Sequence, residues 1–292
     1  MRRPQPPSRR AADPSLATDR RHLTTAAYGT AAPLAARQAI YRYQQPPIDF
    51  LDWALDQVDW RGDERVLDAG CGNGGYLARL ATRLAPGVPR LGLDLSRGML
   101  GDLGAGWDPA LPRPLLATGD VQALPFADGA FDVALAMHML YHVPDIPLAL
   151  RELRRVLRPG GTLLASTNGP DDKRAIDDLV DAAAGALAGH PVALVATPDV
   201  RFNLASGAAL LRDAFASVER RELRRRLVVP APGPVVRFVD STRSFYAPRL
   251  PDGLGWEVLL AEVERRVAAA IAAEGAFVVP LHGGVFLCRS GR

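Results

Sequence analysis

The stretch Val66-Leu67-Asp68-Ala69-Gly70-Cys71-Gly72-Asn73-Gly74-Gly75 predicts a buried strand that turns sharply into a helix. The residues before the turn are mostly apolar, and those after it recur at helical spacing up to about position 84. Glycine permits such a turn and lets a ligand approach the backbone closely. The first amides of the helix have no partner within it and point into the turn. We therefore expect a small-molecule site at the carboxyl end of a strand, where open α/β sheets bind ligands.

An acidic residue at the end of the next apolar run narrows the class of ligand. Asp94 closes the run 90–94, 20 residues after Gly74. A carboxylate at the tip of the second strand can accept hydrogen bonds from both hydroxyls of a ribose. The turn contains no arginine or lysine to neutralise a phosphate, and its rhythm is Gly-x-Gly-x-Gly rather than Gly-x-Gly-x-x-Gly. The sequence thus predicts a nucleoside without phosphates, and a dinucleotide-binding domain is the alternative.

Length and composition set bounds on the class of protein. The chain has 292 residues, of which 48% are hydrophobic, enough for one domain with an elaboration. The two cysteines, Cys71 and Cys288, lie far apart in the sequence, so a reducing cytoplasm is expected rather than a disulfide framework. No apolar run approaches the roughly 20 residues that span a membrane. The histidines show no metal-ligand spacing. We expect no metal and no membrane partner.

Residues 1–22 differ from the rest of the chain. They are rich in arginine, proline and alanine and poor in large apolar side chains, so a disordered tail is expected, with a transit peptide as the alternative. This segment holds six arginines and two aspartates, a net charge of +4, so the rest of the chain carries −1 of the total of +3 and is near neutral. A near-neutral body argues against nucleic acid as the partner.

Short apolar runs alternate with helical segments between residues 65 and 167. The expected strands are 65–68, 90–94, 114–118, 131–137 and 161–167, and the expected helices are 75–85, 97–103 and 147–157. Such strands are typical of parallel sheets buried on both faces. Strict alternation implies right-handed crossovers and a doubly wound α/β sheet.

The pattern changes after residue 168. The expected elements are helices at 172–188, 206–215, 235–246 and 256–274 and strands at 218–229 and 277–289. We expect residues 23–292 to form one domain with its core at 45–170, and residues 23–60 and 235–274 to cap the substrate pocket.

The sequence leaves the roles of two groups of side chains open. Tyr28, Tyr41 and Tyr43 either close over the site or pack in the cap. The five arginines between positions 220 and 226 are expected to guard a solvated strand, with an anionic-substrate patch as the alternative.

Two further stretches carry chemistry. Gly119-Asp120-Val121-Gln122 follows the third strand, where a carboxylate could accept a hydrogen bond from an adenine amino group. Arg158-Pro159-Gly160-Gly161 ends a helix and leads into the fifth strand. In order and spacing, "VLDAGCGNGGYLARLA", "LGLDLSRGML", "GDVQALPFADGAFDVALAMHMLYHVPD" and "LRELRRVLRPGGTLLAS" resemble the class I S-adenosylmethionine-dependent methyltransferases, in particular the bacterial type 11 or UbiE-like group.

The resemblance implies a Rossmann-like, mostly parallel sheet of seven strands with an antiparallel last strand, and S-adenosyl-L-methionine as the cofactor. The residues that it assigns to the cofactor are Asp68, Gly70, Cys71, Gly72, Gly74, Asp94, Leu95, Asp120, Val121 and Met137. In this assignment Asp68 braces the turn and orients the amino group, and Asp94 holds the ribose. Leu95 packs on the adenine, and Asp120 contacts its amino group.

His138 is the candidate general base, and packing beside the cofactor is its alternative role. His142, one helical turn further on, is less favoured as a base. A base is needed only where the acceptor must lose a proton. The expected function is methyl transfer to a small-molecule acceptor, for example in bacterial secondary metabolism. The alternatives are methylation of RNA or protein and a non-catalytic cofactor-binding role. The sequence names neither the acceptor nor the oligomeric state.

Overall fold

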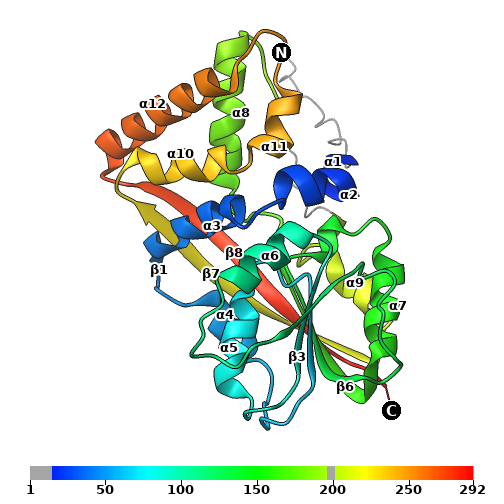
Figure 1. Ribbon diagram of the computed structural model, residues 1–292. Coiled ribbons are helices and arrows are strands. Elements are labelled where there is room, and N and C mark those ends of the chain that lie inside the picture. The colour runs from blue at the N-terminus through cyan, green and yellow to red at the C-terminus, as the bar shows by residue number, and fades with distance from the viewer. Residues whose placement is uncertain (1–14, 196–200, 292) are drawn as a thin grey trace.

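The computed structural model describes residues 15–195 and 201–291, and in it a twisted sheet runs through the molecule (Figure 1). Its strands are β1 (Gln44–Gln45), β2 (Val66–Ala69), β3 (Arg90–Asp94), β4 (Leu115–Thr118), β5 (Phe131–Met137), β6 (Leu157–Asn168), β7 (Ser217–Val229) and β8 (Phe277–Arg289). Their order across the sheet is β1-β7-β8-β6-β5-β2-β3-β4. Strands β4, β3, β2, β5 and β6 pair in parallel, and β8 pairs antiparallel with both β6 and β7. The doubly wound sheet and its antiparallel last strand are confirmed.

Two details of the sheet differ from the expectation. The sheet has an eighth strand, because the two-residue β1 pairs with the outer edge of β7 at Leu227 and Arg226. The fifth expected strand begins earlier than residue 161, because Leu157 already pairs with Phe131 before an irregularity in the register. The glycines at 160 and 161 therefore lie within a strand and do not separate it from the helix.

Helices cover both faces of the sheet, as the alternating sequence predicts. On one face lie α4 (Phe50–Leu55) and α5 (Gly75–Arg83), and on the other lie α7 (Ile146–Val156) and α9 (Gly207–Arg212). Because side chains alternate along a strand, Val133 and Leu135 pack toward α4 and α5, whereas Ala134 packs toward α7. The helix α6 (Arg97–Ala105) follows β3.

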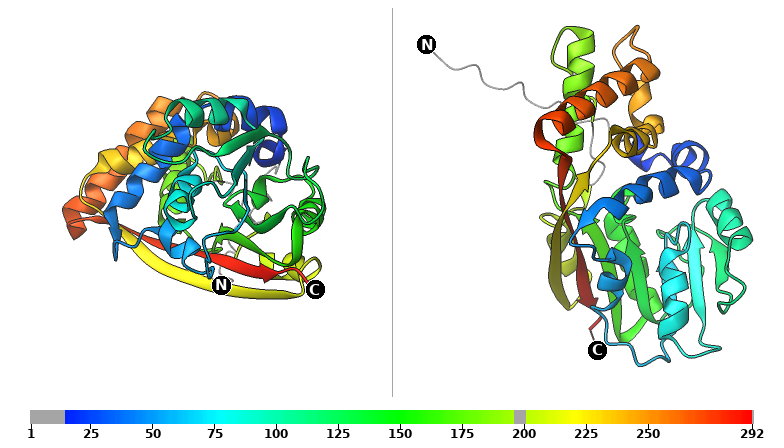
Figure 2. Two further views of the ribbon diagram at one scale, coloured as in Figure 1. Left: turned by 60° about the horizontal axis from the view of Figure 1, so that its bottom comes forward. Right: turned by 90° about the vertical axis from the view of Figure 1, so that its left-hand side faces the viewer.

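A second hydrophobic core lies beyond the carboxyl ends of the parallel strands. The strands β7 and β8 are 13 residues long and extend past the rest of the sheet (Figures 1 and 2). Packed on that extension are α8 (Arg174–Ala188), α10 (Pro232–Asp240) and α12 (Trp256–Glu274). Two short helices, α11 (Arg243–Tyr246) and the 3-10 helix η5 (Ala247–Arg249), lie between α10 and α12 in the chain. The helix expected over 235–246 is thus two helices.

The N-terminal segment is ordered from residue 15 and crosses the same end of the sheet. It forms α1 (Ser15–Thr18), α2 (Arg20–His22), η1 (Leu23–Ala27), α3 (Ala32–Gln38) and η2 (Ala39–Tyr43) (Figure 2). The expectation of a disordered tail is wrong for residues 15–22, and residues 1–14 lie outside the described part of the chain. In the described residues, no helix has the length and apolarity needed to cross a bilayer.

Candidate active site

A cavity of about 830 Å³ lies over the carboxyl ends of the parallel strands. Its floor is formed by the glycine turn after β2 and by the residues that follow β3, β5 and β6. Its roof is formed by the N-terminal segment and by α10 and α11. The residues assigned from sequence that line this cavity are Gly70, Cys71, Gly72, Asp94, Leu95, Asp120, Val121, Met137 and His138. Asp68 and Gly74 lie behind this lining. The structure thus brings together residues from four separate stretches of sequence.

The glycine turn is held by hydrogen bonds to the end of β3. Gly70, Gly72 and Gly74 have φ angles of 74°, 54° and 77°, which favour glycine. The amide of Gly72 donates to Oδ2 of Asp94 at 2.9 Å, and the amide of Ser96 donates to Oδ1 at 2.8 Å. Each carboxylate oxygen has two lone pairs. Asp94 can therefore fix the turn and still accept a hydrogen bond from a ligand.

Asp68 is a buried carboxylate without a hydrogen-bond partner in the described residues. It is fully buried at the end of β2, and neither oxygen accepts a hydrogen bond. Burial, with a smaller contribution from the negative charge of Asp94, raises the pKa of Asp68 to about 7. An unpartnered buried carboxylate is costly, and a positive charge in the turn would offset that cost. The turn and this carboxylate therefore fit a nucleoside that carries a cationic group.

Cys71 is a packing residue in this turn. Its side chain is buried, and that burial raises the pKa of the thiol. A thiol that stays protonated is a poor nucleophile. The sequence-based interpretation of Cys71 as a small residue of the turn agrees with this environment.

Asp120 follows β4, the strand next to β3, and is engaged by the N-terminal segment. Its Oδ1 accepts from the Gln122 amide at 2.9 Å, which fixes the loop after β4. The Arg20 guanidinium forms an ion pair with the same carboxylate. Arg20 was missed from sequence because its surroundings have the composition of a disordered tail. The contact brings the start of the described chain onto a residue that the sequence assigns to the cofactor.

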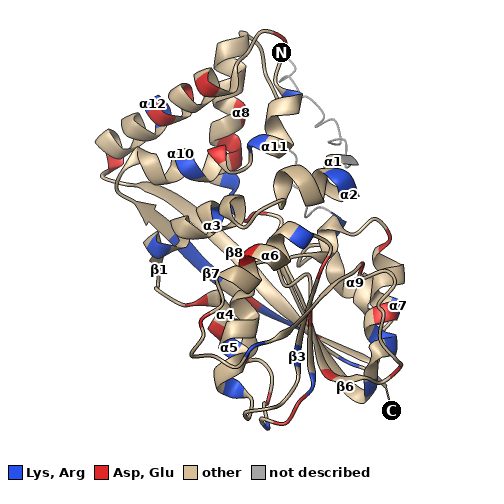
Figure 3. Ribbon diagram, viewed as in Figure 1, with Lys and Arg blue, Asp and Glu red and all other residues tan. Residues whose placement is uncertain are grey.

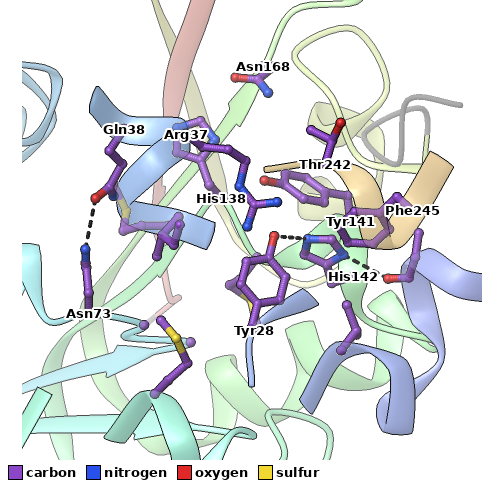
Figure 4. Close-up of a pocket in the computed structure, with 18 of the residues that line it drawn as sticks. Tyr28, Arg37, Gln38, Asn73, His138, Tyr141, His142, Asn168, Thr242 and Phe245 are labelled. Atoms are coloured by element: carbon purple, nitrogen blue, oxygen red, sulfur yellow. Dashed lines mark hydrogen bonds between the residues drawn. The ribbon is translucent and has the colours of Figure 1, made fainter. Parts of the chain in front are cut away.

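His142, at the end of the short 3-10 helix η3 (Leu140–His142) that follows β5, fastens the N-terminal segment (Figure 4). Nδ1 lies 2.8 Å from the carbonyl oxygen of Ala17, which can only accept, so Nδ1 carries the proton. Nε2 therefore accepts from the hydroxyl of Tyr28 at 3.0 Å. Burial lowers the pKa of His142 to about 4, so the imidazole is neutral at neutral pH. With both nitrogens engaged, His142 is a positioning residue, in keeping with its lower rank as a base.

The three N-terminal tyrosines differ in whether they lie over the site or pack in the cap. Tyr28 and Tyr41 line the cavity, whereas Tyr43 packs against the second core and outside the cavity lining. The backbone carbonyl of Tyr28 also accepts from the Ser96 hydroxyl at 2.7 Å. Tyr28 thus links the N-terminal segment to His142 and to Ser96, which caps the start of α6.

The variant Tyr28→Phe is expected to loosen the N-terminal segment. Loss of the hydroxyl leaves Nε2 of the buried His142 without its donor, which costs about 1 kcal/mol of stability. Hydrogen exchange should show faster exchange of the amides at 15–30. Tyr43→Phe is the matched control, since its hydroxyl accepts from the exposed Arg42 outside the cavity. Equal exchange in both variants would show that the Tyr28 bond does not hold the segment.

His138 follows β5 and lies at the centre of the cavity (Figure 4). Its φ angle of 53° is uncommon for a residue other than glycine. The backbone amide donates to the Ser166 hydroxyl at 3.0 Å, and the ring packs 5.3 Å from that of Phe50. Burial, then the positive charges of Lys173 and Arg225, lower the pKa of His138 to about 3. The ring is therefore neutral at neutral pH and is only a weak base.

Arg225 also faces the cavity, which the favoured interpretation of a solvated strand did not predict for it. A usable signal was present, because alternation places Arg225 on the same face of β7 as Leu227, and Leu227 is buried. The other arginines of this run behave as expected. Arg221 pairs with Glu219 and Arg224 with Asp171, with half or more of each arginine side chain exposed.

Comparisons with known proteins agree with this geometry. Residues 67–165 match the family model of a methyltransferase domain. A malonyl-[acyl-carrier protein] O-methyltransferase of Erwinia pyrifoliae is 36% identical over 191 residues, covering 55% of this chain and 69% of that protein. A demethylmenaquinone methyltransferase of Staphylococcus aureus is 35% identical over 104 residues, covering 36% of this chain and 43% of that protein.

Coverage of the relatives is uneven. The chain spans about a third of the length of two other curated relatives, 32% of a transposon protein of Streptomyces fradiae and 37% of a Legionella pneumophila methyltransferase. Among solved structures, the YcgJ protein of Bacillus subtilis has a TM-score of 0.54 at 15% identity, covering 83% of this chain and 98% of that one. At this identity the likeness shows a shared fold alone.

Proposed function

Because the chain belongs to the class I S-adenosylmethionine-dependent methyltransferases of the UbiE-like type, we propose that it transfers a methyl group from S-adenosylmethionine to a small-molecule acceptor. The observation that carries the proposal is one cavity with two unlike parts. One part is the glycine turn with Asp94 and Asp120. The other is bounded by apolar residues of α8, α10 and α11, under the N-terminal segment.

The residues around the turn are those that would hold the cofactor. The backbone of Gly70 and Gly72 would receive its methionine portion, Asp94 its ribose and Asp120 its adenine. When bound, S-adenosylmethionine supplies an electrophilic methyl group on a positively charged sulfur. Asp68 would balance positive charge from behind the turn. Asp120 would have to exchange or share its ion pair with Arg20.

The remaining task of the protein is alignment and exclusion of water. An in-line displacement is accelerated when the two reacting groups are held in the attacking geometry. The N-terminal segment, fastened through His142 and Tyr28, lies over the cavity and would help to exclude water from it. The aromatic rings of Phe238 and Phe245 line the acceptor part. These residues support an acceptor small enough to be enclosed.

His138 is proposed to contact the acceptor. Because its ring is neutral but only weakly basic, it is proposed to take a proton only where the leaving proton is acidic. His138→Asn is expected to lower kcat about tenfold or more with little change in affinity for S-adenosylhomocysteine. Asparagine suits the test because it tolerates the left-handed backbone better than alanine. Steady-state kinetics and calorimetry are the measurements. An unchanged kcat would rule out His138 as the base.

The alternatives differ in what receives the methyl group. The Erwinia and Staphylococcus relatives are named for a malonyl group on an acyl-carrier protein and for demethylmenaquinone, so the relatives do not single out one acceptor. The near-neutral body and the apolar lining of the acceptor part favour a small molecule over RNA or protein. A bacterial metabolic setting, such as secondary metabolism, and the reducing cytoplasm are the contexts that we propose, in which Cys71 and Cys288 are buried free thiols.

The proposed acceptor class is tested by incubating the protein with cell extract and S-adenosylmethionine that carries a labelled methyl group. We expect the label in a metabolite detected by mass spectrometry. Label found only in tRNA or protein would overturn the small-molecule acceptor. Calorimetry with S-adenosylhomocysteine is run alongside, and absence of binding would overturn the proposed function as a whole.

A further inference from the structure

Three arginines that line the cavity, Arg37, Arg225 and Arg249, have no carboxylate partner among the described residues. Arg37 lies on α3, and Arg225 lies on β7, two elements that both carry basic positions (Figure 3). Most other charged lining residues are paired, as Asp49 is with Arg79, Asp172 with Lys173 and Asp120 with Arg20. Arg37 and Arg225, unlike Arg249, also have a buried N–H group without an acceptor, Nη2 of Arg37 and Nε of Arg225. A buried donor left without an acceptor is costly.

Arg37 has no hydrogen bond to any described residue. Its guanidinium stacks over the ring of Tyr28, with Cζ 4.9 Å from the ring centroid, and faces the cavity beside His138 (Figure 4). The neighbouring Gln38 accepts from the side chain of Asn73 at 2.9 Å. That bond ties α3 to the glycine turn. The position of Arg37 is therefore fixed relative to the place where the methyl donor would bind.

Arg225 is anchored more firmly than Arg37. Its Nη1 donates to the side chain of Gln44 at 2.5 Å and to the carbonyl of Ile48 at 3.3 Å. The guanidinium lies 5.3 Å from the ring centroid of Phe50, which in turn packs on His138. Asp49 acts on Arg225 only at longer range and is hydrogen-bonded to Arg79. Arg225 thus adds positive charge on the other side of His138.

We propose that the methyl acceptor carries an oxyanion, a carboxylate or a phosphate, that binds the guanidinium of Arg37. This inference rests on the proposed function and names the substrate class of the same site. A guanidinium offers paired N–H donors that match either oxyanion. The uncompensated charge of Arg225 adds attraction for the anion. The rest of the acceptor lies against the apolar lining, which consists of Ile176, Val180, Val195, Phe238, Val239 and Phe245.

The test measures binding of matched anionic and neutral probes to the protein loaded with S-adenosylhomocysteine. Octanoate, octyl phosphate and the neutral octanamide share one apolar chain. We expect the better of the two anions to bind at least about tenfold more tightly than octanamide. Which anion binds better identifies the oxyanion as a carboxylate or a phosphate.

Variants locate the anion. Arg37→Gln is expected to weaken binding of the preferred anion by about 10- to 100-fold and to leave octanamide unchanged. Arg37→Lys keeps the positive charge but loses the paired N–H donors of the guanidinium. Its affinity for the anion should therefore lie between those of Arg37→Gln and the wild type. Arg42→Gln is the matched control, because Arg42 stacks on Tyr43 at 4.8 Å as Arg37 does on Tyr28 but lies outside the cavity lining. Affinity for S-adenosylhomocysteine reports whether each variant is folded.

Three results would overturn the proposal. The first is equal affinity of the wild type for octanamide and both anions. The second is an equal loss for the anion and octanamide in Arg37→Gln. The third is failure of both anions to bind protein that does bind S-adenosylhomocysteine, which contradicts the anionic acceptor and leaves the proposed function standing. Loss of S-adenosylhomocysteine binding by the wild type would instead contradict the proposed function.

Discussion

Replacing Asp94 with alanine is expected to weaken the binding of S-adenosylhomocysteine by about 100-fold or more. Two effects combine. Hydrogen bonds from the ribose hydroxyls to a carboxylate would be lost, each worth about 1.5–3 kcal/mol. The acceptor of the Gly72 and Ser96 amides would be lost as well, which frees the turn that must receive the ligand. Calorimetry measures the first effect, and hydrogen exchange at 70–75 measures the second.

Two further variants separate these effects. Asp94→Asn keeps one oxygen acceptor and removes the charge, so it should retain more of the turn's protection than Asp94→Ala does. Asp102→Ala is the matched control, because that carboxylate also accepts from a backbone amide, that of Ala31 at 2.8 Å, but does not line the cavity. If Asp94→Ala bound the ligand as tightly as Asp102→Ala does, the ribose role of Asp94 would be wrong.

The glycine turn and its partners were predictable because their geometry is local. Positive φ at three alternate positions requires glycine, and parallel pairing of β2 with β3 places Asp94 beside the turn. The alternation of strands and helices predicts the doubly wound sheet by the same kind of local evidence. Neighbouring parallel strands end at one edge of the sheet, so the binding edge followed from the pattern too.

The covering of the cavity could not be predicted in this way. Ala17 and His142 are separated by 125 positions in the sequence, and the composition around Ala17 is that of a disordered tail. No feature of the local sequence distinguishes a short helix that packs against a distant histidine from one that does not. The limit is weaker for Arg225, because strand alternation places it on the same face of β7 as the apolar Leu227. Its inward direction depends on the register with β8 and on the burial of Leu227.

The variant Asp68→Asn is expected to remove a pH dependence of stability. The folded protein raises the pKa of Asp68 from 3.8 to about 7, so between these values the unfolded chain is ionised at this residue and the folded chain keeps the proton. Stability therefore falls as pH rises through that window and is constant above it. At about 1.4 kcal/mol per unit, the fall is on the order of 4 kcal/mol. Denaturant unfolding of both proteins between pH 4 and 8 measures the two slopes, and equal slopes would contradict the assignment.

The same carboxylate makes a prediction about binding. A cationic ligand in the turn favours the ionised form of Asp68, so binding should release a proton from the wild type as pH approaches 6. Calorimetry in two buffers of different ionisation enthalpy counts that proton, which should be absent in Asp68→Asn. Asp94 is buried too and keeps its own raised pKa in both proteins, so the difference between them isolates Asp68. If the wild type and Asp68→Asn released protons equally, a group other than Asp68 would balance the positive charge of the ligand. Release confined to the wild type would explain why a costly buried carboxylate lies behind the turn, since the free energy lost in the empty protein is recovered when the positively charged ligand binds.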